Sequence, residues 1–564
     1  MASEKVVVIN SEPVSDTESG FPREATEEEL ATLPRVVDHI PLAAWAAALV
    51  GAAERFSYYA IVSIWQNYMQ HERGFRAVPG ALGLGQSTAT SISNGFFVFS
   101  FLTPMLFAVI SDVWLGRYNT LVVAFCLLIC GAATMFATSL PVALDAGAGV
   151  PGLAVSMIFT ALGVGGIKST ISPFIGDQYR ENQKEPRVIR LKNGTLAIAD
   201  GSRTIQFIYN AFYWFTNIAS LSAIPATFLE REFDFWTAYL MAASSLVVCL
   251  GVLLSLKSKL VKVVPHENVL PKAIKVLSVA ARNGFKLDNA KGDYQLQRHG
   301  QTVPWDDEFV NELKQGLVAC RVIFSFAFFY LSITQMYNNL ISQAGTMNLH
   351  GVPNDMVQAM ASVACVVFGP PIQALYNFLA KHRIPFGPIA RISTAFLLCG
   401  GGMAYAAGLQ KLVYSTGPCY DAPLACPASD GGRIPNDVNV WLQLPVYVAL
   451  AIAEIFGLVT ASQYSYEKAP KGMRGVVQAM VQLSACLGAL MGMAISPAAR
   501  DPWLVAVYGA LAGVLGLCSL VFWWIFRKYD RIDEKADPLN QGSAERLRGC
   551  GENKEREENG TKSQ

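Results

Sequence analysis

The chain has 564 residues, of which 52% are hydrophobic and 15% are charged, and its formal net charge at pH 7 is +1. A soluble globular protein carries about 25% charged residues, so this composition argues against a soluble domain and favours a membrane protein. The near-zero net charge gives no sign of nucleic-acid binding or of an acidic partner.

Polar segments lie at both ends of the chain. Residues 1–40 and 528–564 are rich in charge, and we predict that both are disordered. The N-terminal segment lacks the basic stretch and short apolar run of a cleaved signal peptide. The first spanning helix is therefore expected to act as the insertion signal.

Between these ends lie apolar blocks, many of them near or above the roughly 20 residues that a helix needs to cross a bilayer. A charged segment, 257–317, divides the blocks into two sets of six. The sequence thus predicts an all-α polytopic membrane protein with two six-helix bundles, 41–256 and 318–527. The twelve predicted transmembrane helices are 41–69, 88–111, 119–140, 150–175, 203–228, 236–256, 318–343, 354–380, 386–409, 440–466, 475–497 and 502–527.

We interpret the segment 257–317 as a linker between the bundles. Phe309, Leu313 and Leu317 recur at the spacing of one helix face, which predicts an amphipathic helix before the seventh span. The alternative is that these residues extend the seventh span itself.

Basic residues in the loops predict the orientation. The short loops after helices 2, 4, 8 and 10 hold 11 Lys and Arg residues, against 6 in the loops after helices 1, 3, 5, 7, 9 and 11. Because basic loops stay in the cytoplasm, both termini and the linker are predicted to be cytoplasmic. Cys419 and Cys426 share the loop after helix 9, where a disulfide requires an extracellular position, and their spacing alone leaves the pairing open.

Four ionisable residues lie inside predicted spans. Glu54 and Arg55 are in helix 1, Lys168 in helix 4 and Glu454 in helix 10. A central charge costs about 2.5–3.5 kcal/mol on insertion scales, so these groups should face a cavity or each other. Cations in the first half and an anion in the second suit a zwitterionic peptide, with its carboxylate toward Lys168 and its ammonium toward Glu454. The alternative is that the four groups only pair to lock helices together.

Aromatic residues in the spans could contact varied substrate side chains, although packing is the plainer explanation; they are Tyr58, Tyr59, Tyr213, Trp214 and Tyr337. The glycine run from Gly163 to Gly166 lies inside a span, which predicts close helix packing rather than a phosphate site. The six histidines form no metal-ligand pair, and no nucleophile–base motif stands out. We therefore expect no enzyme activity, no metal and no cofactor.

Five segments resemble the proton-dependent oligopeptide transporter family, and its fungal members above all. The segments are Glu54–Tyr59, Gly163–Lys168 with Asp177–Gln178, Phe212–Ser220, Gln335–Asn339 with Gln343–Met347, and Lys468–Arg474. They occur in matching order, and the resemblance covers residues 41–527. The turn Asp112–Arg117 is similar to the general cytoplasmic motif of major facilitator proteins. The resemblance implies a major facilitator fold, whose substrate site lies between the two halves near the bilayer midplane.

The resemblance also implies roles for single residues. The family imports di- and tripeptides by alternating access with protons. Its substrate-contacting and cavity-lining positions match Arg55, Tyr58, Tyr59, Lys168, Asn217 and Glu454, to which we add Tyr337 as an aromatic candidate. Its proton-coupling positions match Glu54, Arg55 and Lys168, and its conformational latch matches Asp112 and Arg117. By resemblance we expect a monomer in the lipid bilayer, in the plasma membrane, with a small peptide and protons as its partners.

The sequence also departs from the family pattern. Gly51, Thr334, Ala361, Gln373 and Gln463 stand where acidic or other polar residues are usual, and Ala219 replaces a glycine. These changes leave Glu54 as the leading candidate for the proton site. They also leave open an exporter or carrier of a peptide-derived secondary metabolite or another nitrogenous solute, with weakened proton coupling. A sensor that transports nothing is disfavoured, because both terminal extensions are short.

Overall fold

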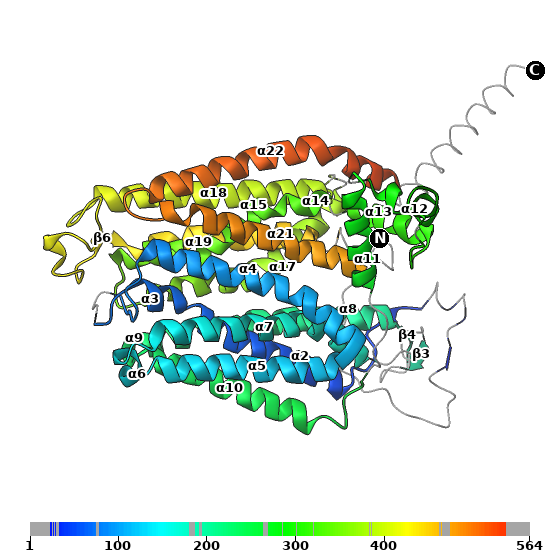
Figure 1. Cartoon of the computed structure of the whole chain (residues 1–564), viewed down its shortest axis with the longest axis horizontal. Coiled ribbons are helices and arrows are strands. Elements are labelled where there is room, and N and C mark those ends of the chain that lie inside the picture. Colours follow the sequence, from blue (N-terminus) through cyan, green and yellow to red (C-terminus); the bar gives the residue numbers. More distant parts are fainter. Residues whose placement is uncertain are drawn as a thin grey trace, which may run out of the picture.

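The structure of the chain is a computed structural model. It describes residues 23–24, 26, 29, 33–74, 78–179, 187–190, 195–262, 269–284, 286–300, 302–319, 321–382, 384, 386–461, 464 and 474–536. Gln463, the stretch Lys468–Met473 and the predicted tail beyond Ala536 lie outside these ranges. Long helices run side by side along the longest axis of the molecule (Figure 1).

The first bundle surrounds one continuous hydrophobic core, built from buried residues between Ala44 and Leu260 together with Ala489. Its helices are α2 (Leu42–Val62), α3 (Trp65–Gln70), α4 (Gln86–Ile110), α5 (Arg117–Thr138), α7 (Gly149–Asp177), α8 (Gly201–Ser220), α9 (Ala223–Glu232) and α10 (Phe235–Ser255). A π-helical turn, η1 (Ser111–Leu115), continues α4, and the short α6 (Pro141–Asp145) lies in a loop.

The second bundle has its own core, formed by buried residues between Val322 and Phe522. Its long helices are α17 (Ala359–Lys381), α18 (Pro388–Ser415), α19 (Leu444–Glu454), α21 (Arg474–Ile495) and α22 (Leu504–Ala536). The shorter helices are α14 (Arg321–Phe324), α15 (Phe326–Ile333), η4 (Thr334–Tyr337), α16 (Asn339–Gly345), η5 (Met356–Gln358), η6 (Pro427–Ser429), η7 (Val440–Gln443), η8 (Ile455–Val459) and η10 (Ser496–Ala498).

The described part of the chain contains nine helical segments that are long and apolar enough to cross a membrane. The other three predicted spans correspond to broken helices: α2 with α3, α8 with α9, and α14 through α16. The helices are therefore consistent with the predicted twelve. Large apolar side chains such as Val248, Leu517 and Trp524 are 67%, 63% and 70% exposed on the helix surfaces. Lipid solvates such surfaces, which confirms the prediction of a multi-pass membrane protein.

The linker folds into helices at one end of the molecule, called here the linker end (Figure 1). They are α11 (Val269–Arg282), η3 (Leu287–Ala290), α12 (Gly292–His299) and α13 (Asp307–Ala319). Their shared core includes Trp305 and Leu313 and extends to Val476 of α21, with Val109 of α4 packed at its edge. Phe309, Leu313 and Leu317 lie on α13 and belong to this cluster, so the predicted helical face is present, and α14 of the seventh span follows from Arg321. The linker thus contacts both bundles.

A four-stranded sheet also lies at the linker end. Its order is β1 (Arg23–Glu24), β3 (Arg187–Arg190), β4 (Leu196–Ala199) and β2 (Arg35–Val36), and only β2 and β4 pair in parallel. Asp38 accepts hydrogen bonds from Arg187 at 2.7 Å and from the Tyr179 hydroxyl at 2.8 Å. Residues 1–40 therefore include two short strands where disorder was predicted. The prediction missed them because such strands form only by pairing with a distant segment of the chain.

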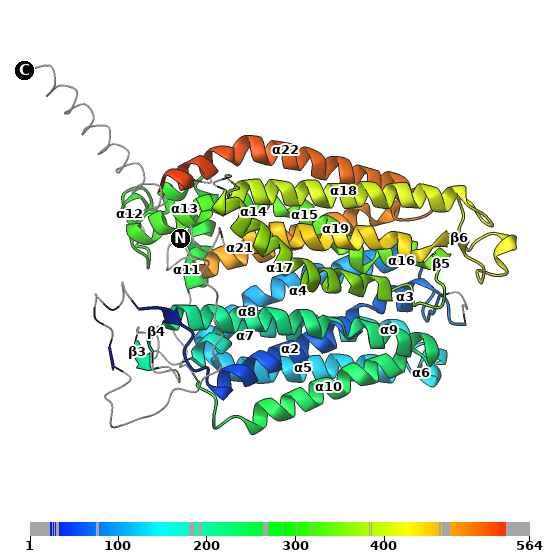
Figure 2. The same ribbon diagram turned by 180° about the vertical axis from the view of Figure 1, so that it is seen from behind.

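The opposite end carries the loop between α18 and α19 and is called here the disulfide end. Cys419 and Cys426 are joined by a disulfide, with their Cα atoms 5.4 Å apart. The pairing that the sequence left open is thus present. Nearby, β5 (Met347–Asn348) pairs in parallel with β6 (Asn436–Asn439), as the view from behind shows at the same end (Figure 2).

Candidate functional site

A cavity of about 300 Å³ lies between the two bundles. Helices α2, α7 and α8 form one wall, and η4, η5, α17 and α19 form the other. Helices α8 and α17 pack against each other beside it, as Figure 2 shows. The predicted site residues that line the cavity are Glu54, Arg55, Tyr59, Lys168, Asn217, Tyr337 and Glu454.

The first wall carries an ion pair and a separate cation. Arg55 donates from Nε and Nη2 to the two carboxylate oxygens of Glu54, at 2.6 Å and 2.9 Å. Glu54 is 1% exposed, so this fork neutralises a buried charge. Lys168 has no ion pair with a carboxylate of the described residues, and its Nζ lies 4.9 Å from the centre of the Phe101 ring. The wall therefore has one uncompensated positive charge.

Tyr58 supports the cations without lining the cavity. Its ring centre lies 4.9 Å from Cζ of Arg55 and 5.9 Å from Nζ of Lys168. An aromatic face attracts a cation at these distances. Tyr58 is 8% exposed and belongs to the first core, so it contacts the two cations from the core side rather than from the cavity.

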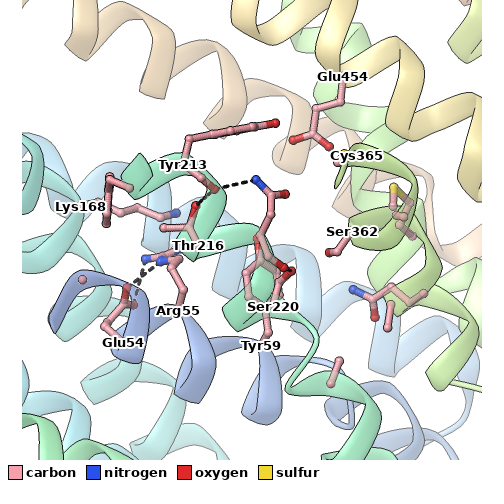
Figure 3. Close-up of a pocket in the computed structure, with 18 of the residues that line it drawn as sticks. Glu54, Arg55, Tyr59, Lys168, Tyr213, Thr216, Ser220, Ser362, Cys365 and Glu454 are labelled. Atoms are coloured by element: carbon pink, nitrogen blue, oxygen red, sulfur yellow. Dashed lines mark hydrogen bonds and ion pairs between the residues drawn. The ribbon is translucent and has the colours of Figure 1, made fainter. Parts of the chain in front are cut away.

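The second wall carries Glu454 at the last residue of α19, where the helix widens into the π-helical turn η8. Such turns inside helices are frequent at functional sites. Glu454 forms no ion pair with any basic residue that the structure describes. Figure 3 shows its carboxylate across the cavity from Lys168 and Arg55. The cavity thus has a positive wall and a negative wall.

Polar side chains that the sequence reasoning missed line the space between these charges. On α8, the polar Thr216 and Ser220 lie four residues apart on one helix face. In the facing bundle, Gln358 of η5 and Ser362 and Cys365 of α17 follow one another at spacings of four and three residues. Thr216 and Asn217 each donate a hydrogen bond to the carbonyl oxygen of Tyr213, at 2.7 Å and 2.8 Å. A row of polar side chains on one face of an apolar span was the sequence signal that could have identified these lining residues.

Gly51 lies in the cavity wall where the family pattern has a glutamate. A Cβ atom at this position would lie 2.7 Å from Ile171 Cγ1 and 2.7 Å from Phe212 Cε2. Real Cβ contacts are longer, so α7 and α8 occupy the space that a side chain on α2 would need. The absence of a carboxylate at position 51 is therefore tied to the close packing of α2 against α7 and α8. Ala361 also lines the cavity, which leaves an apolar methyl group where the family has a polar side chain.

The predicted latch residues lie at the linker end, away from the cavity. Arg117 Nη1 contacts both carboxylate oxygens of Asp177, at 2.7 Å and 2.6 Å. Asp112 lies in η1, the turn just before Arg117. The Arg117 partner that the structure shows is thus Asp177 at the end of α7, which joins the start of α5 to α7.

Side-chain hydrogen bonds join the two bundles at the disulfide end. Gln66 donates to Ser342 at 3.2 Å, and Thr90 donates to Asn339 at 3.1 Å. Ser87 donates to the carbonyl oxygen of Ser496 at 2.8 Å. All of these groups are uncharged, and each of the three bonds joins one bundle to the other.

Comparisons with known proteins agree with this architecture. Residues 118–510 match the model of the POT family. The peptide transporter PTR_C of Candidozyma auris is 36% identical over 530 residues, which cover 94% of this chain and 91% of that protein. The probable peptide transporter ptr2 of Schizosaccharomyces pombe is 37% identical over 518 residues, which cover 91% of this chain and 82% of that protein.

A solved structure shows the same fold. The POT family transporter PepTSo superposes with a TM-score of 0.68 and 18% identity, covering 88% of this chain and 99% of that chain. The family match spans most of the chain, and two relatives exceed 30% identity over most of their length. The chain therefore belongs to the POT family of transporters and is not an enzyme.

Proposed function

We propose that this protein transports di- and tripeptides or similar zwitterionic solutes across a membrane by alternating access. The observation that carries the proposal is the uncompensated cation of Lys168 on one wall of the cavity and the unpaired carboxylate of Glu454 on the other. A small peptide presents a carboxylate and an ammonium group at its two ends. It would satisfy both walls at once, with Asn217, Tyr59 and Tyr337 around its middle. The printed names of the relatives, peptide transporters of two fungi, support this substrate class.

Proton coupling would act through the fork between Glu54 and Arg55. When Glu54 takes a proton it loses its charge, and its hold on Arg55 weakens. Arg55 can then turn to the carboxylate of the peptide beside Lys168. Binding of a proton and binding of a peptide would thus favour each other, which is the linkage that a symporter needs.

We further propose that the protein acts as a monomer in the plasma membrane, with both termini and the linker end in the cytoplasm. The excess of Lys and Arg in the loops on that side supports this orientation. Asp112 and Arg117 would then form part of a cytoplasmic latch that loosens when the bundles move.

Uptake of a labelled dipeptide into proteoliposomes tests the proposal. Wild type should take up the dipeptide faster with an inward proton gradient, Lys168→Ala should lose uptake, and Glu54→Gln should lose only the stimulation by the gradient. Wild-type uptake that ignores the gradient would contradict proton coupling. No uptake under any condition would favour an exporter or carrier of modified peptides, which inside-out vesicles would reveal.

A further inference from the structure

A second polar cluster lies at the disulfide end, outside the central cavity. Asn67 of α3 and Glu230 of α9 belong to the first bundle, and Asn354 and Asp355 precede α17 in the second. Their exposed fractions are 1%, 3%, 0% and 0%. Asn67 donates to Glu230 Oε1 at 3.2 Å and to Asn354 Oδ1 at 2.8 Å, and Asn354 donates back to Asn67 at 2.9 Å. The two amides thus largely satisfy each other.

The two carboxyl groups of this cluster, on Glu230 and Asp355, are buried and interact with each other. Asn67 links their two segments, because it hydrogen-bonds both to Glu230 and to Asn354, the residue before Asp355. Oε2 of Glu230 and both carboxylate oxygens of Asp355 lack a well-directed donor among the described residues. Two ionised carboxylates in contact inside a protein repel strongly, and neither can donate a hydrogen bond. One proton between them removes the repulsion and turns the contact into a hydrogen bond.

The described residues around the pair supply no cation in place of that proton. The titratable groups that act on the pair are Asp234 beyond α9, Tyr239 of α10 and Tyr447 of α19, with Tyr68 of α3 against the Tyr239 ring. Among the described residues, no basic side chain forms an ion pair with Glu230 or Asp355, and no group of three His, Cys, Asp or Glu could hold a metal ion. Arg231 and Glu232, next along α9, are exposed at the surface.

We propose that Glu230 and Asp355 bind one proton between them and that this proton latches the two bundles at the disulfide end. The shared hydrogen bond spans the interface, since one partner belongs to each bundle. When the bundles separate there, both carboxyls meet water, ionise and repel. Acidity at that end would therefore favour the closed arrangement seen here.

This proton differs in role from the proton that drives transport. It enters and leaves on the side of the disulfide end, whereas Glu54 lies in the central cavity on α2. The outward orientation of this end rests on the proposed function; the latch itself does not. External acidity would thus act on how readily the bundles close at the disulfide end, separately from the proton gradient that drives transport.

Amide hydrogen exchange on the full-length protein in lipid nanodiscs tests the latch without any substrate. The segments to follow are 64–72 and 338–358, with exchange corrected for its intrinsic dependence on pH. In wild type, protection of these segments should fall by about tenfold or more between about pH 5 and about pH 8, since a one-proton site changes tenfold per pH unit above its midpoint. Segment 269–282 at the linker end should keep its protection and serves as an internal reference.

Three variants make the test specific. Glu230→Gln and Asp355→Asn each place a permanent amide donor where the proton would be, so protection should change less than about twofold over the same range. Asp234→Asn removes a neighbouring charge but keeps the helix cap on Phe235, so it should retain the wild-type dependence. Wild-type protection that does not depend on pH, or a full dependence in both amide variants, would overturn the proposal. If one amide variant does not fold, the other tests the same proton from the opposite bundle.

The two proposals can fail separately. Hydrogen exchange reports the latch even if no peptide is transported, and uptake driven by a gradient can persist in Glu230→Gln even if no latch exists.

Discussion

Lys168 and Glu454 put opposite charges on facing walls of one cavity, and each would bind one end of a zwitterion. A hydrogen bond to a charged group contributes about 1.5–3 kcal/mol, which corresponds to about tenfold to a hundredfold in affinity. We expect Glu454→Gln to weaken binding of a free dipeptide by that factor. The affinity for an N-acetylated dipeptide, which has no ammonium group, should change less than about twofold in the same variant. Competition against uptake of a labelled dipeptide measures both.

Lys168→Gln is the matched control, because it should show the reverse pattern. It should weaken binding of the free dipeptide but leave a C-amidated dipeptide nearly unaffected. Equal losses for blocked and free peptides in both variants would mean that the two residues only shape the cavity.

The charged residues of the site could be predicted from the sequence because ionisable groups stand out inside apolar spans. Their partners could not. The fork from Arg55 to Glu54 depends on side-chain conformation, and Asp177 approaches Arg117 only when α7 packs against α5. Glu230 and Asp355 were missed because each lies at the edge of a span, where a charge is ordinary. They become a pair only in the folded protein, where the two bundles bring them together.

At the scale of single helices, Gly51 lets α2 approach α7 and α8 closely. Gly51→Ala would press a methyl group against Ile171 and Phe212, so it should destabilise the protein by about 1–3 kcal/mol. Gly251→Ala on α10 is the control, since a Cβ there meets nothing within 4 Å. Removing that glycine from a helix should be neutral or stabilising by about 0.5–1 kcal/mol. Thermal unfolding in detergent compares the two, and equal stability would show that Ile171 and Phe212 yield into the cavity.

The helices themselves could largely be predicted, since long apolar runs mark α4, α5, α7, α10, α18 and α22. The breaks between α2 and α3 and between α8 and α9 were harder to predict. The residues around Ser63 and Leu221 are equally compatible with a continuous helix. The strands β1 and β2 carry no signal of their own. They are two residues long and depend on β3 and β4, which follow far along the chain.

The orientation of the whole molecule can be tested with single cysteines. Ile434, 48% exposed in the loop of the disulfide end, and Leu296, 54% exposed on α12, lie at opposite ends. Ile434→Cys should react with a membrane-impermeant maleimide in intact cells, whereas Leu296→Cys should react only after permeabilisation. Unmodified protein, with Cys126 and Cys130 exposed on α5, sets the background. The reverse pattern would place the linker end outside the cell.

Apart from the Glu230–Asp355 pair, hydrogen bonds between the bundles at the disulfide end join neutral groups, namely Gln66, Ser87, Thr90, Asn339 and Ser342. Dissolved ions screen charge–charge attraction but leave hydrogen bonds between neutral groups nearly untouched. Each of these bonds contributes only about 0.5–1.5 kcal/mol, because water replaces it when the seal opens. While the Glu230–Asp355 pair keeps its proton, opening should therefore depend little on ionic strength, a tolerance that a seal made of ion pairs would not have.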